Sequence, residues 1–81
     1  MNTTELRAAA ENKDWRGVLK ITSGYTSHVD VRTIFACARA LQTPGFATYP
    51  EEVEEKLFRA LGSLERFNAQ KVAEIKARLA R

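Results

Sequence analysis

Apolar residues at helical spacing are the feature that most limits how this chain can fold. Between a small number of glycines and prolines, apolar side chains recur every three or four positions, which places them on one face of an α-helix. A chain of 81 residues has the size of a single domain. The spacing therefore predicts an all-α fold over residues 1–81, built as a compact bundle of four or five short helices.

The N-terminal part of the chain predicts an αα-hairpin. Asn2 or Thr3 can cap a first helix rich in alanine, and Asp14 can cap a second helix that begins at Trp15. Two helices joined by two or three residues are expected to pack antiparallel. Residues 6–21, with alanines in the first arm and Trp15 opening the second, loosely resemble the hairpins of tetratricopeptide-type proteins. The repeat of about 34 residues that defines that family is absent.

Capping and turn residues separate the remaining predicted helices. Ser27 can cap a third helix, and Pro50 suits the first turn of a fourth. We expect the pair Gly62-Ser63 to kink or end the fourth helix and Asn68 to cap a fifth. The apolar positions of all these helices give a predicted core of Leu6, Ala9, Trp15, Val18, Leu19, Ile34, Phe35, Ala38, Leu41, Val53, Leu57, Leu61, Leu64, Val72, Ile75 and Leu79.

The compartment is predicted from features that the sequence lacks. Cys37 is the only cysteine, so no intrachain disulfide can form, which fits a reducing compartment. The polar N-terminal residues do not resemble a signal peptide, and no stretch approaches the roughly 20 apolar residues that span a bilayer. We therefore expect a cytoplasmic protein that does not contact a membrane. Its size is typical of small bacterial or phage open reading frames.

No group of residues has the pattern of a catalytic or metal site. His28 is the only histidine, and we expect it in a loop or at a helix cap; Cys37 lies among apolar neighbours and is expected in the core. The glutamates of residues 51–55 have no histidine or cysteine beside them, as a zinc site would need. They fit the start of a solvated helix, or an acidic docking surface. We predict no enzyme activity, no cofactor, no metal and no small-molecule substrate.

Aromatic residues in predicted loops favour a protein-binding function. Such residues are enriched at binding hot spots, and a core this small gains from the surface of a partner. The alternative is that the aromatics cover the ends of the core. We predict a small non-enzymatic protein-binding module that acts as an adaptor, a chaperone-like subunit or an inhibitor of a larger partner. A homodimer through the last two helices is included. The predicted partner-binding residues are Tyr25, Phe46, Tyr49, Glu51 and Glu52.

Basic residues gather in the last third of the chain. Residues 1–55 carry six basic and eight acidic side chains, a net of −2, whereas residues 56–81 carry seven basic and two acidic ones, a net of +5. A basic outer face on the last helix can contact nucleic-acid phosphates, or it can be a solvated face of the kind favoured at a helix C-terminus. The alternative function is a small nucleic-acid-binding regulator that uses Arg66, Lys71, Lys76, Arg78 and Arg81.

Overall fold

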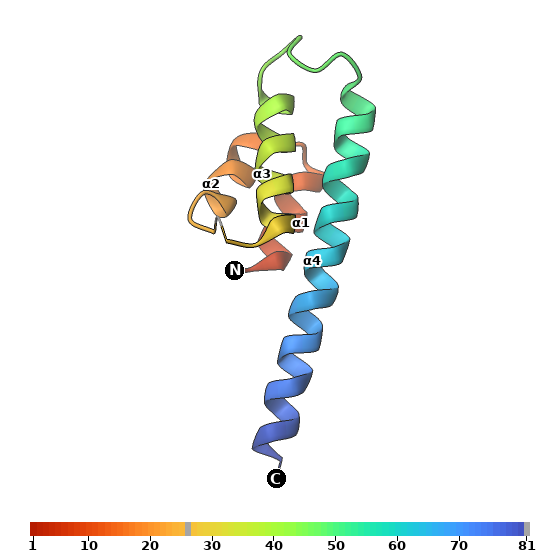
Figure 1. Ribbon diagram of the computed structural model, residues 1–81. Coiled ribbons are helices and arrows are strands. Elements are labelled where there is room, and N and C mark those ends of the chain that lie inside the picture. Colours follow the sequence, from red (N-terminus) through yellow and green to blue (C-terminus); the bar gives the residue numbers. More distant parts are fainter. Residues whose placement is uncertain (26, 81) are drawn as a thin grey trace.

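The described part of the protein folds into four α-helices. The computed structural model describes residues 1–25 and 27–80, and these residues contain no β-strand. The all-α class is therefore confirmed, and four helices is one of the two predicted numbers. The helices are α1 (Thr3–Glu11), α2 (Trp15–Thr22), α3 (Val29–Gln42) and α4 (Pro50–Leu79). Figure 1 shows α4 running alongside α1 and α3 and extending beyond them, with α2 farther from α4.

The first two helices begin at the predicted caps. The Asn2 side chain accepts a hydrogen bond from the backbone N–H of Glu5 at 3.1 Å, and Asp14 accepts one from that of Gly17 at 3.0 Å. Between α1 and α2 the chain turns at Lys13, whose φ of 56° is left-handed. The N–H of Lys13 donates to the carbonyl of Ala10, and that of Asp14 donates to Ala9, which is the Schellman pattern of a helix end.

Replacing Lys13 by glycine is expected to stabilise the protein. A left-handed backbone is unfavourable for a residue with a Cβ and is free of that cost for glycine, so we expect the free energy of unfolding to rise by about 0.5–1 kcal/mol. The matched control is Lys13→Ala, which keeps the Cβ and removes only the exposed Lys13–Glu54 ion pair of 3.7 Å. That control is expected to lose less than about 0.5 kcal/mol. Urea denaturation measures both, and destabilisation by Lys13→Gly would contradict the assigned turn.

The third helix begins at a different cap from the predicted one. His28, rather than Ser27, is the N-cap residue, and its Nδ1 accepts a hydrogen bond from the N–H of Asp30 at 3.1 Å. Ser27 lies one residue too early to reach the same N–H groups. The expectation that His28 is a loop or cap residue is confirmed.

A single long helix replaces the predicted fourth and fifth helices. Helix α4 runs for 30 residues through Gly62 and Ser63 without a break, so the prediction that the helix ends there is wrong. A glycine inside a helix costs only about 1 kcal/mol, whereas Leu61 and Leu64 on either side are buried by continuing the helix. Asn68 consequently lies inside the helix and caps nothing.

The core lies where α4 packs against α1 and α3, and α2 packs against α1 and α3. Its fully buried side chains include Leu6, Val18, Ile34, Leu57 and Leu61. Most of the predicted core is confirmed, either buried or packed against the buried cluster. Three predicted members are wrong, because their side chains remain 50%, 53% and 80% exposed: these are Val72, Ile75 and Leu79. Four buried residues are missing from the predicted core, which are Ala10, Thr22, Val31 and Ala60.

The molecule is more elongated than a compact bundle. Its extents are 54 × 23 × 20 Å and its radius of gyration is 14.0 Å, against about 12 Å for a compact chain of this length. Figure 1 shows the reason, since the C-terminal half of α4 extends past the other helices. No helix in the described part of the chain is both long and apolar enough to cross a membrane.

Candidate partner-binding surfaces

The turn between α3 and α4 presents two aromatic side chains to solvent. Gly45 has a φ of 77° and follows Pro44, and the N–H of Phe46 donates to the carbonyl of Thr43 at 3.1 Å. These are the features of a type II turn, which needs glycine at its third position. Phe46 emerges from this turn 72% exposed, and Tyr49 is 64% exposed at the N-cap of α4.

Three of the predicted partner-binding residues line one groove at this corner. Phe46, Tyr49 and Glu52 surround a shallow hollow whose other walls include Ala40 and Val53. We call these five residues the corner surface. It brings apolar and aromatic groups next to one carboxylate, which is a composition suited to binding another protein.

The other two predicted partner-binding residues lie outside the corner surface. Tyr25 follows α2 and lines a separate hollow with Phe35 and Arg32, while Glu51 is exposed in the first turn of α4 but does not line the groove. Tyr25 is 48% exposed. All three loop aromatics, Tyr25, Phe46 and Tyr49, are therefore exposed, and none is buried over an end of the core. Trp15, in contrast, packs against the core cluster.

The C-terminal part of α4 forms a second exposed surface. Every residue from Ala69 to Ala80 is exposed, and we call residues 69–79 the projecting segment. We call α1, α2, α3 and the part of α4 before residue 69 the body. The projecting segment starts at the end of this body, where Met1 and Thr3 line a hollow with Val72. Close by, the His28 ring meets that of Phe67 edge-on, with the ring centres 4.9 Å apart. Beyond this level no other helix of the described residues lies beside α4 (Figure 1).

An apolar stripe runs along the projecting segment. Because an α-helix turns about 100° per residue, Val72, Ile75 and Leu79 fall within an arc of about 60°. We call these three residues the seam. Val72 lies eleven residues after Leu61, and Ile75 lies eleven residues after Leu64. Eleven residues make three nearly ideal turns, so the seam continues the buried face of α4 in a straight line.

The predicted nucleic-acid-binding residues do not form one outer face. Lys71 and Arg78 lie on one side of the seam and Lys76 on the other, each about 60–90° from its centre, while Arg66 lies opposite the seam. Within the described residues none of these four side chains is in an ion pair. Lys71 Nζ lies 5.7 Å from the centre of the Phe67 ring. Arg81 falls outside the described residues.

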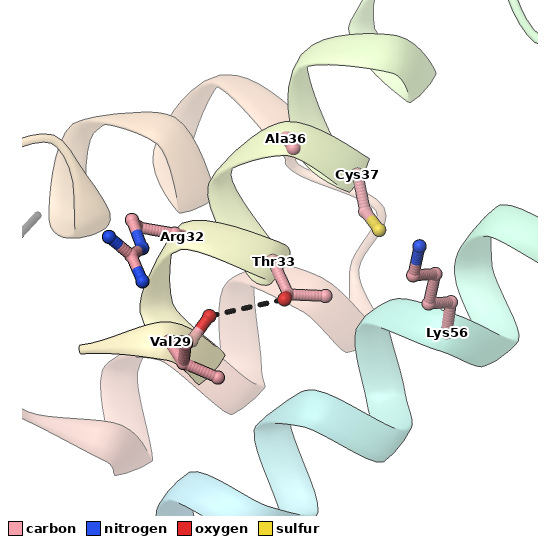
Figure 2. Close-up of a pocket in the computed structure, with 6 residues that line it drawn as sticks. All are labelled: Val29, Arg32, Thr33, Ala36, Cys37 and Lys56. Carbon is pink, nitrogen blue, oxygen red and sulfur yellow. Dashed lines mark hydrogen bonds between the residues drawn. The ribbon is translucent and has the colours of Figure 1, made fainter.

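Cys37 is a core residue beside a surface hollow. Figure 2 shows the Cys37 side chain and the Lys56 amine on opposite sides of this hollow, which Val29 and Thr33 also line. The cysteine is only 6% exposed, as its apolar sequence neighbours predicted. Burial raises the pKa of the Cys37 thiol, and the charge of Lys56 offsets this effect only in part. The thiol is therefore protonated at neutral pH, which is the less nucleophilic form.

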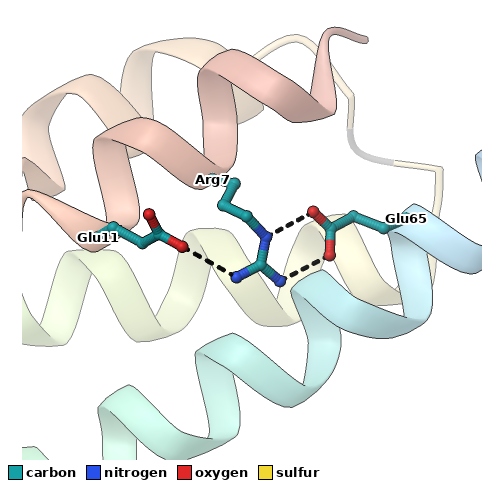
Figure 3. A network of polar contacts seen from close by, with 3 residues as sticks. All are labelled: Arg7, Glu11 and Glu65. Carbon is teal, nitrogen blue, oxygen red and sulfur yellow. Dashed lines mark hydrogen bonds and ion pairs between the residues drawn. The ribbon is translucent and has the colours of Figure 1, made fainter.

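An ion pair joins the first and last helices. Arg7 on α1 donates two hydrogen bonds of 2.6 Å to the two carboxylate oxygens of Glu65 on α4, and a third of 3.3 Å to Glu11 (Figure 3). The hydrogen bonds from Arg7 lower the pKa of Glu65, and those from Glu65 raise the pKa of Arg7. This contact holds α1 against α4 just before the projecting segment.

The Arg7–Glu65 pair is expected to make stability depend on pH. Since the folded pKa of Glu65 lies below its unfolded value of about 4.3, the contribution is present above that pH and is lost as the pH falls through the folded pKa. Both side chains are about one-third exposed, so we expect only about 0.5 kcal/mol. When urea unfolding is measured at pH 7 and pH 3, the free energy of unfolding of the wild type should fall by about 0.5 kcal/mol more than that of Glu65→Gln. Equal losses would contradict a functioning ion pair.

The acidic start of α4 is divided among separate contacts. Glu55 pairs with Arg59 at 2.6 Å, and Glu54 lies 3.7 Å from Lys13. Among the described residues no three potential metal ligands come together.

Comparisons of the chain with known proteins identify no relative. No protein-family model matches the chain, and neither a curated protein nor a solved structure matches it significantly.

Proposed function

We propose that this protein is a small non-enzymatic protein-binding module. The observation that carries the proposal is the corner surface, where the two most exposed aromatic side chains, Phe46 and Tyr49, line one groove beside Glu52. Large aromatics anchor protein interfaces because they bury much apolar area at a small cost in conformational entropy. An adaptor, a chaperone-like subunit or an inhibitor would each use such a surface.

Substitution of the corner aromatics tests the proposal. Partners are captured from a lysate on the immobilised full chain, identified, purified and titrated against variants of the protein. We expect Phe46→Ala and Tyr49→Ala each to weaken binding at least about tenfold while the melting temperature changes little, because both side chains are exposed. Tyr25→Ala is the matched control, an exposed aromatic outside the corner, and should bind as the wild type does.

Two results would overturn this function. If Phe46→Ala lowered the melting temperature as much as it lowered binding, the aromatics would serve the fold. If every captured protein bound the Phe46→Ala and Tyr49→Ala variants as tightly as the wild type, the corner would not be the binding site.

Nucleic-acid binding is the second candidate function. It is favoured by the exposure of Lys71, Lys76 and Arg78 on a segment that extends past the other described helices. The test is titration with a mixed-sequence DNA duplex and a single-stranded RNA at several salt concentrations. Binding that falls steeply with salt and is lost on Lys71→Glu with Lys76→Glu would support this candidate. Binding unchanged by the charge reversal would exclude it.

A further inference from the structure

We propose that the seam binds an acidic amphipathic helix of another protein, which extends the helical packing of the body along the projecting segment. This surface lies near the end of α4 opposite the corner surface, and the proposal does not depend on that surface. It rests on three properties of the seam: its continuity with the core, its narrow width and the charges beside it.

The seam is the unpartnered continuation of a packed face. Leu57, Leu61 and Leu64 use the same side of α4 to bury themselves against α1 and α3. Further along α4 the same side carries Val72, Ile75 and Leu79, which are at least half exposed. Helices α1 and α3 both begin near the level where the seam starts, since Met1 lines a hollow with Val72 and the His28 ring contacts that of Phe67. A partner helix bound to the seam would therefore continue the helical packing along α4 beyond the N-terminal ends of α1 and α3.

The width of the seam favours a helix over a lipid surface. An arc of about 60° with residues at three- and four-residue spacing is the narrow stripe typical of a helix-to-helix contact. Helices that lie in a membrane surface present a broader apolar face, with aromatic residues among the aliphatic ones. The seam has no aromatic member, because Phe67 lies beside its start and contacts His28.

The charges beside the seam favour an acidic partner. Lys71 and Arg78 flank it on one side and Lys76 on the other, in the positions that face the flanks of a bound helix. Among residues 66–80 the only carboxylate is that of Glu74. Glu65, near the start of the seam, is already held by Arg7. Glutamates or aspartates on both flanks of the partner would therefore meet cations on both sides.

The same charges disfavour a second copy of this chain as the occupant. Two projecting segments packed on each other would bring Lys71, Lys76 and Arg78 against identical cations, and like charges across an interface are repulsive. The homodimer through this part of α4 is therefore less favoured than an acidic helix.

The test uses the full chain and two synthetic amphipathic helices as probes. Both peptides carry leucines at three- and four-residue spacing; one has glutamates and the other lysines on its flanks. We expect the acidic peptide to bind at least about tenfold more tightly than the basic one. Ile75→Ser should weaken that binding at least about tenfold without lowering the melting temperature, because Ile75 is 53% exposed. Lys71→Glu with Lys76→Glu should reverse the preference between the peptides.

Control variants separate this proposal from its alternatives. Arg66→Glu changes a charge on the opposite side of α4 and should leave peptide binding within about twofold. Phe46→Ala should also bind normally, so failure of the corner surface does not affect the result. Equal affinity for both peptides, or unchanged binding by Ile75→Ser, would overturn the proposal. A dimer in light scattering that the acidic peptide does not dissociate, or anionic vesicles binding the seam in place of either peptide, would overturn it as well.

Discussion

Leu61→Ala is expected to lower the free energy of unfolding by about 3 kcal/mol. The Leu61 side chain is fully buried where α4 packs against the body, so the substitution removes apolar contacts and leaves a cavity. A chain of this length has about 4–12 kcal/mol of stability in total. The variant should therefore unfold at a much lower urea concentration than the wild type.

The matched control for Leu61→Ala is Leu79→Ala, the same substitution on the same side of the same helix. Leu79 is 80% exposed, and its truncation should change the free energy of unfolding by no more than about 0.5 kcal/mol. Urea denaturation followed by circular dichroism measures both variants. Equal losses would show that both halves of α4 are packed, and would contradict the division of α4 into a buried half and a projecting segment.

Ser63→Pro is expected to cost about 3 kcal/mol or more, because α4 is continuous at this position. Proline removes the N–H that bonds to the preceding turn, and its ring clashes with the carbonyl of Arg59. Had the helix ended at Gly62-Ser63, one of the two outcomes that the sequence predicts there, a proline at residue 63 would lie just after a helix end and be tolerated.

Ser63→Ala is the control for the proline variant. Alanine keeps the backbone N–H and has a better helix propensity, so its stability should be equal to that of the wild type or slightly higher. Thermal unfolding of the three proteins makes the comparison. Equal stability of Ser63→Pro and Ser63→Ala would contradict a continuous α4.

Local signals in the sequence predicted the beginnings of helices well. Asn2, Asp14 and Pro50 each start a helix for a reason contained in two or three neighbouring residues, and the structure confirms all three. The helix end expected at Gly62-Ser63 does not occur, because glycine inside a helix costs only about 1 kcal/mol and the burial of leucines on either side outweighs this cost. Their burial depends on helices far away in the sequence.

The exposed seam could not be predicted from periodicity alone. Val72, Ile75 and Leu79 have the same spacing as the buried leucines, and periodicity shows which side of a helix is apolar without showing what covers it. Helix length contains the missing signal. At about 1.5 Å per residue, α3 with 14 residues is about 21 Å long, whereas α4 with 30 is about 45 Å long. Part of α4 must therefore extend beyond its neighbours.

The candidate residues for binding were predicted in part. Phe46, Tyr49 and Glu52 share a groove because a turn and the first helical turn bring them together over a few residues. Tyr25 belongs to another loop and lies in a different hollow, which no local pattern reveals. Within the proposed function, two surfaces near opposite ends of α4 favour an adaptor, which contacts two partners, over an inhibitor, which needs only one.

Amide hydrogen exchange along α4, measured by NMR on a dilute sample, tests most directly whether this helix is half packed and half free. We predict that the amides of residues 57–64 exchange only on global unfolding. Those of residues 70–79 should show little protection, because no other helix of the described residues covers them. Addition of the acidic peptide should raise protection in the second group. Strong and equal protection along the whole of α4 in the isolated protein would contradict the account, because the projecting segment would then already be covered.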